Sequence, residues 1–156
     1  MTTTHPFVEI VSTGRYLPDH VMTNREMESI VETTDEWIVE RTGIRERRIA
    51  PAEMTAADMG AAAAEIAMER AGVTGEEVDV LIVSTTTPDR LLPATACDVQ
   101  ALVGASNAVA FDVIGACTGF LYALTVAEAF AQTPRWGRQT SRKRREGSIF
   151  NIAGWG

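Results

Sequence analysis

The chain has 156 residues, 46% of them hydrophobic, and a formal net charge of −7. This length and hydrophobic content are sufficient for one domain with a core and do not indicate a disordered chain. The two cysteines, Cys97 and Cys117, and the two histidines lack metal-ligand spacing, which argues against a structural metal site. The N-terminus has no secretion signal, and the longest uncharged run, 113–127, is too short to span a bilayer. We expect a cytoplasmic protein with reduced thiols and no membrane segment.

One strand and two short helices are predicted near the N-terminus. The β-branched run at 7–11 is typical of a strand and is expected to open the sheet. Thr23 and Thr33 each stand three residues before a glutamate, which is the spacing of a capping box. We therefore expect helices over residues 24–31 and 34–41.

The second of these helices places Trp37 and Arg41 four residues apart on one face, where an indole ring and a guanidinium group can form a joint surface. Periodicity by itself favours the other interpretation, a tryptophan in the core beside a solvated arginine. Three arginines follow within residues 45–48. They could bind phosphate or pair with Glu40 and Glu46, and the charge count does not decide between these alternatives.

The middle of the chain is expected to alternate between helices and strands. Thr55 is the predicted N-cap of a long alanine-rich helix that ends just before Gly72. The aliphatic run 78–84 is typical of a strand buried on both faces of a parallel sheet, which requires helices on both sides. A further helix is expected over 94–103, and Cys97 within it is interpreted as a packing residue.

Cys117 stands between a predicted strand at 108–113 and a predicted apolar helix at 119–131. Gly115 and Gly119 flank it and would allow a sharp strand-to-helix turn of the kind that presents a nucleophile. The unpaired N–H groups and the dipole of the first helical turn favour the reactive thiolate. The pattern fits equally well a small buried hydrophobic residue at a close contact between helix and strand, so both interpretations stay open here.

The helix after the cysteine is predicted to bury Phe120, Leu124 and Ala127 on one apolar face. The order of the elements predicts an α/β fold with parallel strands and right-handed crossovers.

The character of the sequence changes after residue 132. Residues 133–156 hold six Arg and Lys against one Glu, whereas residues 1–132 hold eight Arg against 20 Asp and Glu. The basic tail has no helical or alternating pattern and offers only a short apolar piece at 149–152. We predict no regular element in it.

Four segments carry a resemblance to a known family: 33–38, 41–47, 93–97 and the cysteine turn at 110–121. In this order and spacing they resemble 3-oxoacyl-(acyl carrier protein) synthase III, the initiating condensing enzyme of fatty-acid synthesis in the thiolase-like superfamily. The resemblance implies that residues 1–132 form a partial N-terminal thiolase-like domain. It implies an α/β fold, here an incomplete first αβαβα half with a mainly parallel sheet.

The resemblance assigns roles to five residues. Cys117 matches the nucleophile that takes an acyl group from acyl-CoA, with its own N–H in the oxyanion hole, before malonyl-acyl carrier protein is decarboxylated and condensed with that group. Trp37 matches the aromatic residue that stacks on the CoA adenine, and Thr33 and Arg41 match residues of the same nucleotide site. Leu92 matches a residue, often aromatic, that reaches towards the partner's acyl pocket in a homodimer, so a leucine is expected to alter primer preference. No permanently bound cofactor and no metal are implied.

The sequence departs from this family in its second half. The resemblance implies a histidine and an asparagine for decarboxylation, but neither His5 nor His20 matches such a position, and Asn151 lies in the unmatched tail. We therefore expect a truncated chain with little or no condensing activity and a doubtful homodimer. A frameshift or an out-of-frame fusion near Gln132 would explain the basic tail, residues 133–156, which we otherwise expect to be disordered.

The alternative is a non-catalytic α/β binding module whose basic tail binds nucleic acid. An unpatterned arginine run beside an interrupted family motif instead favours an accidental tail, so nucleic acid is not the expected partner. A cysteine hydrolase is disfavoured because no histidine follows Cys117 in the chain to act as its base.

Overall fold

The computed structural model describes residues 8–133 and 148–153 of the chain. The chain forms two compact units. The small unit consists of residues 17–54, and the large unit consists of the chain before residue 17 and after residue 54. Residues 1–132, which the sequence groups as one partial domain, therefore contribute to both units.

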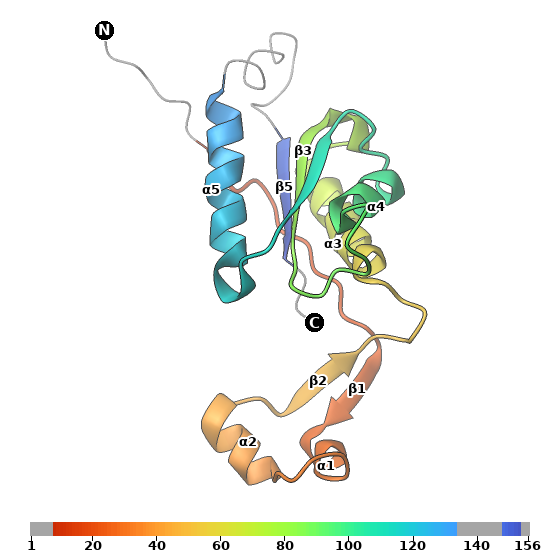
Figure 1. The fold of residues 1–156 in the computed structure, drawn as a ribbon, viewed down its shortest axis with the longest axis vertical. Coiled ribbons are helices and arrows are strands. Elements are labelled where there is room, and N and C mark those ends of the chain that lie inside the picture. Colours follow the sequence, from red (N-terminus) through yellow and green to blue (C-terminus); the bar gives the residue numbers. More distant parts are fainter. Residues whose placement is uncertain (1–7, 134–147, 154–156) are drawn as a thin grey trace, which may run out of the picture. The chain divides into compact units, whose positions relative to one another are not determined.

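The large unit is built around strand β3 (Val78–Ser84). β3 pairs in parallel with β4 (Val109–Val113) along one edge and with β5 (Ser148–Ala153) along the other, so the strand order is β4-β3-β5 (Figure 1). The strands predicted at 78–84 and 108–113 and their parallel pairing are confirmed.

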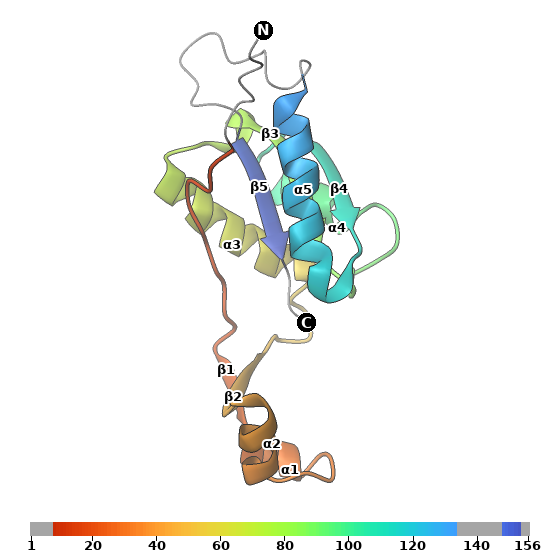
Figure 2. The same cartoon turned by 90° about the vertical axis from the view of Figure 1, so that its left-hand side faces the viewer.

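Three helices cover this sheet. α3 (Ala56–Ala71) and α4 (Thr95–Leu102) pack against one face of β3, and α5 (Gly119–Gln132) packs against the other (Figure 2). Two short 3-10 turns, η1 (Gly75–Glu77) and η2 (Ala116–Thr118), lead into β3 and α5. This layering is what a fully apolar parallel strand requires, because each of its faces must be covered.

The predicted ends of α3 are confirmed. Thr55 is its N-cap, and Gly72 ends it in the left-handed conformation with a φ of 65°. The hydrogen bonds that Asp58 accepts from the side chain and the backbone N–H of Thr55 lower the pKa of that carboxyl. Such reciprocal bonds satisfy N–H groups that have no partner within the helix.

The core divides at β3 into two apolar clusters. Leu81 and Val83 pack with small residues of α3 and α4, whereas Val80 and Ile82 pack with Ala123 and other residues of α5. Ile82 is fully buried, with 0% of its surface exposed. Because successive side chains of β3 point to opposite faces of the sheet, this one strand contributes to both apolar clusters.

The strand predicted at 7–11 is wrong for residues 8–11, which have no strand structure, while Phe7 lies outside the described residues. Both edges of β3 are already occupied by β4 and β5. The segment instead contacts α3, because the Ser12 hydroxyl donates to the Ala67 carbonyl at 2.7 Å. Gly14 lies so close to α3 that a Cβ there would collide with the backbone of residue 63.

The prediction that the tail contains no regular element is wrong for Ser148–Ala153, which form β5. A strand that pairs in parallel with β3 needs no alternating pattern. The hydrophobic periodicity of the short apolar run at 149–152 therefore does not predict β5. The arginines on which the nucleic-acid alternative rests, between residues 135 and 145, lie outside the described residues.

The small unit pairs β1 (His20–Thr23) with β2 (Glu46–Ile49) in antiparallel fashion, and two helices lie between them in sequence: α1 (Asn24–Glu28) and α2 (Asp35–Thr42). The capping box predicted at Thr23 is present. At the second helix the N-cap is Thr34, whose hydroxyl accepts from the Trp37 N–H at 3.1 Å, so the cap predicted at Thr33 is wrong by one residue.

Within the described ranges, no helix combines the length and apolar character that crossing a membrane requires. The same residues contain no group of three or more His, Cys, Asp or Glu side chains that could hold a metal ion.

Replacing Ile82 with alanine should lower the free energy of unfolding by about 2–5 kcal/mol, because it leaves a cavity between the sheet and α5. The same change at Ile114, which is 69% exposed, should alter it by no more than about 0.5 kcal/mol. Urea unfolding of both variants measures the difference, and equal losses would contradict this assignment of the core.

Candidate functional site

Cys117 lies at the junction between β4 and α5, as the sequence predicts. It occupies the 3-10 turn η2, in which the N–H of Thr118 donates to the carbonyl of Gly115 at 3.0 Å. Its thiol is free and its side chain is exposed. The interpretation of Cys117 as a small buried hydrophobic residue is therefore wrong. The residue also precedes the first turn of α5 instead of lying within it, since α5 begins at Gly119.

The two flanking glycines serve a different purpose from the predicted one. Gly115 has a φ of −146° and Gly119 has a φ of −57°, so neither adopts the left-handed conformation. The positive φ, 44°, falls on Ala116 instead, directly before the cysteine. A non-glycine residue in this region is uncommon and costs free energy, and such strain is concentrated at functional sites.

Close packing explains why the glycines are needed. A Cβ at Gly115 would lie 2.6 Å from a ring carbon of Tyr122, and a Cβ at Gly119 would collide with the hydroxyl of Ser84. Ser84 is the last residue of β3 and is buried. The start of α5 is thus pressed against the end of the central strand, and this contact sets where the turn carrying Cys117 leaves the sheet.

The buried face of α5 matches the prediction only in part. Ala127 is buried as predicted, together with Gly119 and Ala123, whereas Leu124 is half-buried and Phe120 is 42% exposed. The close approach at Gly119 fixes the rotation of the helix, and residues four apart then follow it inward. Sequence periodicity could not show this, because α5 is apolar on nearly all sides.

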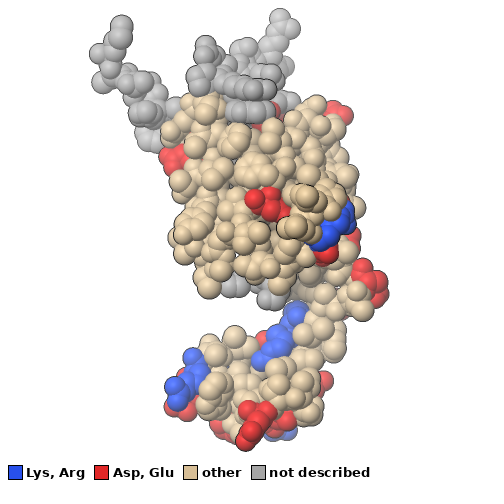
Figure 3. Space-filling model, viewed as in Figure 1, with Lys and Arg blue, Asp and Glu red and all other residues tan. Residues whose placement is uncertain are grey.

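Large apolar side chains near the cysteine turn and in the loop after β3 remain exposed. Leu91 and Leu92 are 82% and 79% exposed, and Leu121 and Tyr122 are 60% and 53% exposed. Figure 3 shows few charged side chains on the visible face of the large unit. The role of Leu92 at a partner's acyl pocket stays a prediction.

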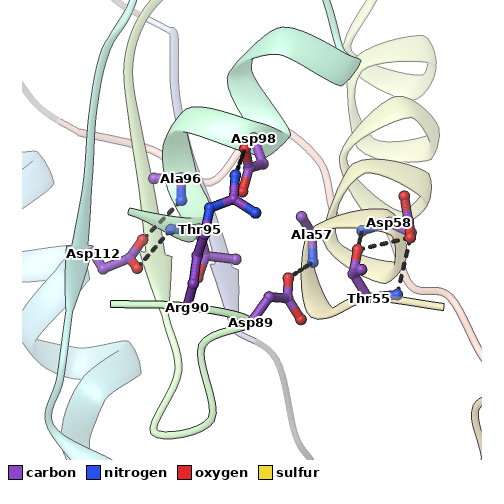
Figure 4. A network of polar contacts seen from close by, with 9 residues as sticks. All are labelled: Thr55, Ala57, Asp58, Asp89, Arg90, Thr95, Ala96, Asp98 and Asp112. Carbon is purple, nitrogen blue, oxygen red and sulfur yellow. Dashed lines mark hydrogen bonds and ion pairs between the residues drawn. The ribbon is translucent and has the colours of Figure 1, made fainter. Parts of the chain in front are cut away.

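Two aspartates that the sequence reasoning missed hold the loop that carries Leu92 (Figure 4). Before this residue, the carboxylate of Asp89 accepts from the backbone N–H groups of residues 56 and 57, at 2.8 and 3.1 Å. After it, the carboxylate of Asp112 accepts from the N–H groups of Thr95 and Ala96, both at 2.8 Å. Each carboxylate therefore caps the positive N-terminus of a helix to which it does not belong.

Asp112 belongs to β4, the strand that leads into the cysteine turn, so it ties that strand to the start of α4. An ion pair between Arg90 and Asp98, at 2.6 Å, adds a second link from the loop to α4. The contacts of Asp89, Asp112 and Arg90 join residues that are 8 to 33 positions apart in the chain. No local pattern marks such caps, which explains why sequence reasoning did not find them.

The small unit presents the predicted pair of Trp37 and Arg41. The guanidinium carbon of Arg41 lies 5.9 Å from the centre of the Trp37 ring, and the tryptophan is 56% exposed. The core interpretation of Trp37 is therefore wrong, and the joint surface is present. Thr33 precedes this helix, and its hydroxyl is buried without a hydrogen-bond partner.

The neighbouring arginines mostly make structural contacts. Arg47 donates to the side chain of Asn24 at 2.7 Å, and Arg48 donates to the carbonyl of Pro18 at 3.1 Å. Arg48 also lies 3.9 Å from the carboxylate of Glu46, which is one of the pairings that the charge pattern allowed.

The predicted site residues are divided between the units. Thr33, Trp37 and Arg41 belong to the small unit, whereas Leu92 and Cys117 belong to the large unit. The structure brings Trp37 and Arg41 into contact.

Solved structures resemble this chain closely. 3-Oxoacyl-[acyl-carrier-protein] synthase III from Aquifex aeolicus VF5 is 50% identical, with a TM-score of 0.74 over 78% of this chain and 39% of that one. The priming β-ketosynthase of the R1128 polyketide pathway is 39% identical, with a TM-score of 0.75 over 79% of this chain and 37% of that one. The chain is therefore an α/β protein with part of the thiolase-like fold, as predicted.

Curated relatives that match the chain share one printed name. The chain is 52% identical over 123 residues to beta-ketoacyl-[acyl-carrier-protein] synthase III of Aliarcobacter butzleri. This match covers 78% of the chain and 37% of that protein. It is 49% identical over 127 residues to the protein of the same name from Pasteurella multocida, covering 81% and 40%. The resemblance to 3-oxoacyl-(acyl carrier protein) synthase III is thus confirmed for the N-terminal part of that protein. The chain spans about two fifths of the length of these relatives, and no family model matches it.

Replacing Gly119 with alanine should lower the free energy of unfolding by about 1–3 kcal/mol, because the new methyl group collides with the Ser84 hydroxyl. The added change Ser84→Ala removes that hydroxyl and leaves the Ser84 Cβ at 3.5 Å, an ordinary contact distance. The double variant should therefore recover most of the loss in thermal or urea unfolding. A double variant no more stable than Gly119→Ala would contradict the proposed contact.

Proposed function

We propose that this chain carries out acyl transfer from acyl-CoA to Cys117, the first half of the condensing reaction of 3-oxoacyl-(acyl carrier protein) synthase III. The observation that carries the proposal is the free, exposed thiol in a strained turn between a parallel strand and an apolar helix. Identity near 50% to proteins of that name across the turn supports it.

The transfer needs only the thiol and a stabilised oxyanion. The Cys117 thiol loses its proton to solvent, which later returns a proton to the CoA thiolate, and the Cys117 sulfur attacks the thioester carbonyl carbon of acyl-CoA. The carbonyl oxygen becomes negative and is stabilised by backbone N–H groups, including that of Cys117. The intermediate then collapses: the bond between the carbonyl carbon and the CoA sulfur breaks, and the CoA thiolate takes up a proton. The substrate itself brings the activated acyl group, so the step requires no permanently bound cofactor.

The exposed face of α2 is the proposed site for the nucleotide part of CoA. The Trp37 ring offers a flat surface for the adenine, and the Arg41 guanidinium beside it offers charge-assisted hydrogen bonds to phosphate. The Thr33 hydroxyl next to the start of the same helix is buried without a protein partner, so it would reach the nucleotide only after a local rearrangement. The two free cysteines also suit the reducing conditions of the cytoplasm.

Leu92 is the proposed contact to the acyl chain, in a homodimer where it reaches the partner's pocket. Its exposure leaves it available for this contact, and Asp89 and Asp112 fix the loop on either side of it. Dimer formation and the identity of the acyl group are part of the proposal.

Malonyl-acyl carrier protein is the proposed second substrate of the complete reaction. The histidine and asparagine that the resemblance implies for its decarboxylation match no position in these 156 residues. We therefore propose that these residues by themselves accept an acyl group and do not complete the condensation.

Incubation of the full chain with acetyl-CoA should add one acetyl group, detected by mass spectrometry of the intact protein and of its peptides. The variant Cys117→Ser should lose the adduct, because an alcohol is a far weaker nucleophile than a thiolate. Cys97→Ser is the matched control and should keep it, since Cys97 is only partly exposed, within α4. An adduct on Cys97, or none in the unmodified chain, would overturn the proposal.

The acetylated chain should release no carbon dioxide from malonyl-acyl carrier protein, because the groups that stabilise the carbanion are not supplied. A trapping assay for labelled carbon dioxide measures this directly. Release above the rate without protein would refute the proposed division between transfer and condensation.

A further inference from the structure

The helix that carries Trp37 and Arg41 has little apolar burial, since Ile38 and Val39 are only half-buried. None of the eight residues of α2 is buried. A helix normally gains most of its stability from an apolar face that packs against the core. Polar contacts at its ends therefore contribute to the orientation of α2.

One side chain supplies contacts at both ends. The amide nitrogen of Asn24 donates to the carboxylate of Asp35, the first residue of α2, at 2.7 Å. The same nitrogen donates at 2.8 Å to the carbonyl of Ile44, which follows the C-cap of α2 at Gly43. Asn24 thus links the side chain of the first residue of α2 to the segment just after its C-cap, and only 1% of the Asn24 surface is exposed.

The rest of the Asn24 hydrogen-bonding capacity is also used. Its amide oxygen accepts from the guanidinium of Arg47 on β2 at 2.7 Å, and its backbone N–H donates to the carbonyl of Arg45 at 3.3 Å. A buried amide with every polar atom satisfied has one favoured orientation, because any rotation leaves a donor or an acceptor without a partner. The amide therefore fixes the ends of α2 relative to β2.

We propose that Asn24 is a positioning residue for the nucleotide-binding face of α2. It contacts no substrate and acts through Asp35 and the Ile44 carbonyl, which set the direction of the helix carrying Trp37 and Arg41. This inference rests on the proposed function, since it takes that face to bind the nucleotide of acyl-CoA.

The test compares two acetyl donors in single-turnover acylation of Cys117 in the full chain. Acetyl-CoA carries the nucleotide, whereas acetyl-pantetheine lacks it. In Asn24→Ala the half-saturating concentration of acetyl-CoA should rise about tenfold, the loss expected for a hydrogen-bonded link to a charged group. The maximal rate and the rate with acetyl-pantetheine should not change.

Two further variants separate positioning from general damage. Asn107→Ala removes an asparagine side chain of the large unit, which donates to the Glu76 carbonyl at 3.1 Å. This control variant should leave the half-saturating concentration of acetyl-CoA unchanged. Asn24→Asp with Asp35→Asn exchanges donor and acceptor, so it restores the link to α2 but not the one to Ile44. This pair should recover part of the loss.

An equal slowing of both donors in Asn24→Ala would overturn the inference, and so would an unchanged half-saturating concentration of acetyl-CoA. Amide hydrogen exchange gives a readout that does not depend on CoA. Exchange in α2 should be faster in Asn24→Ala than in the unmodified chain, and unchanged exchange would overturn the inference by itself. Failure of the unmodified chain to accept acetyl from acetyl-CoA would refute the proposed function, while hydrogen exchange would still decide the role of Asn24.

Discussion

The large unit depends on the burial of β3 on both faces. On one face of β3, α5 packs against Val80 and Ile82. On the other face, α3 and α4 pack against Leu81 and Val83. The strand also ends at Ser84, whose hydroxyl packs against the start of α5. Burial of this one strand therefore decides both the layering of the unit and the point from which the cysteine turn projects.

Hydrogen bonds between residues distant in sequence then position the segments that have little apolar burial. Asp89 and Asp112 cap helices that begin far from them in sequence and so fix the loop around Leu92. Asn24 does the equivalent for α2 in the small unit. In each case a side chain satisfies backbone or side-chain groups that would otherwise lack partners, which ties the segments carrying Leu92 and Trp37 to neighbouring elements without using apolar area.

Local patterns predicted the elements whose determinants are close together in sequence. The caps at Thr55 and Gly72 and the aliphatic run at 78–84 lie within or beside the elements they specify, and all were placed correctly. Errors arose where another part of the chain decides. Residues 8–11 form no strand, and Ser12 beside them bonds to α3 instead, whereas part of the tail pairs with β3 as β5.

Local sequence patterns predict the α/β order, the strand–turn–helix around Cys117 and the spacing of Trp37 and Arg41, because each follows from residues that are close together in the chain. The packing of the folded chain was needed to show that Trp37 is exposed, that α5 buries Gly119 and leaves Phe120 exposed, and that Asn24 links Asp35 to the Ile44 carbonyl. Exposure, helix rotation and long-range hydrogen bonds depend on which surfaces meet, and residues distant in sequence set those surfaces.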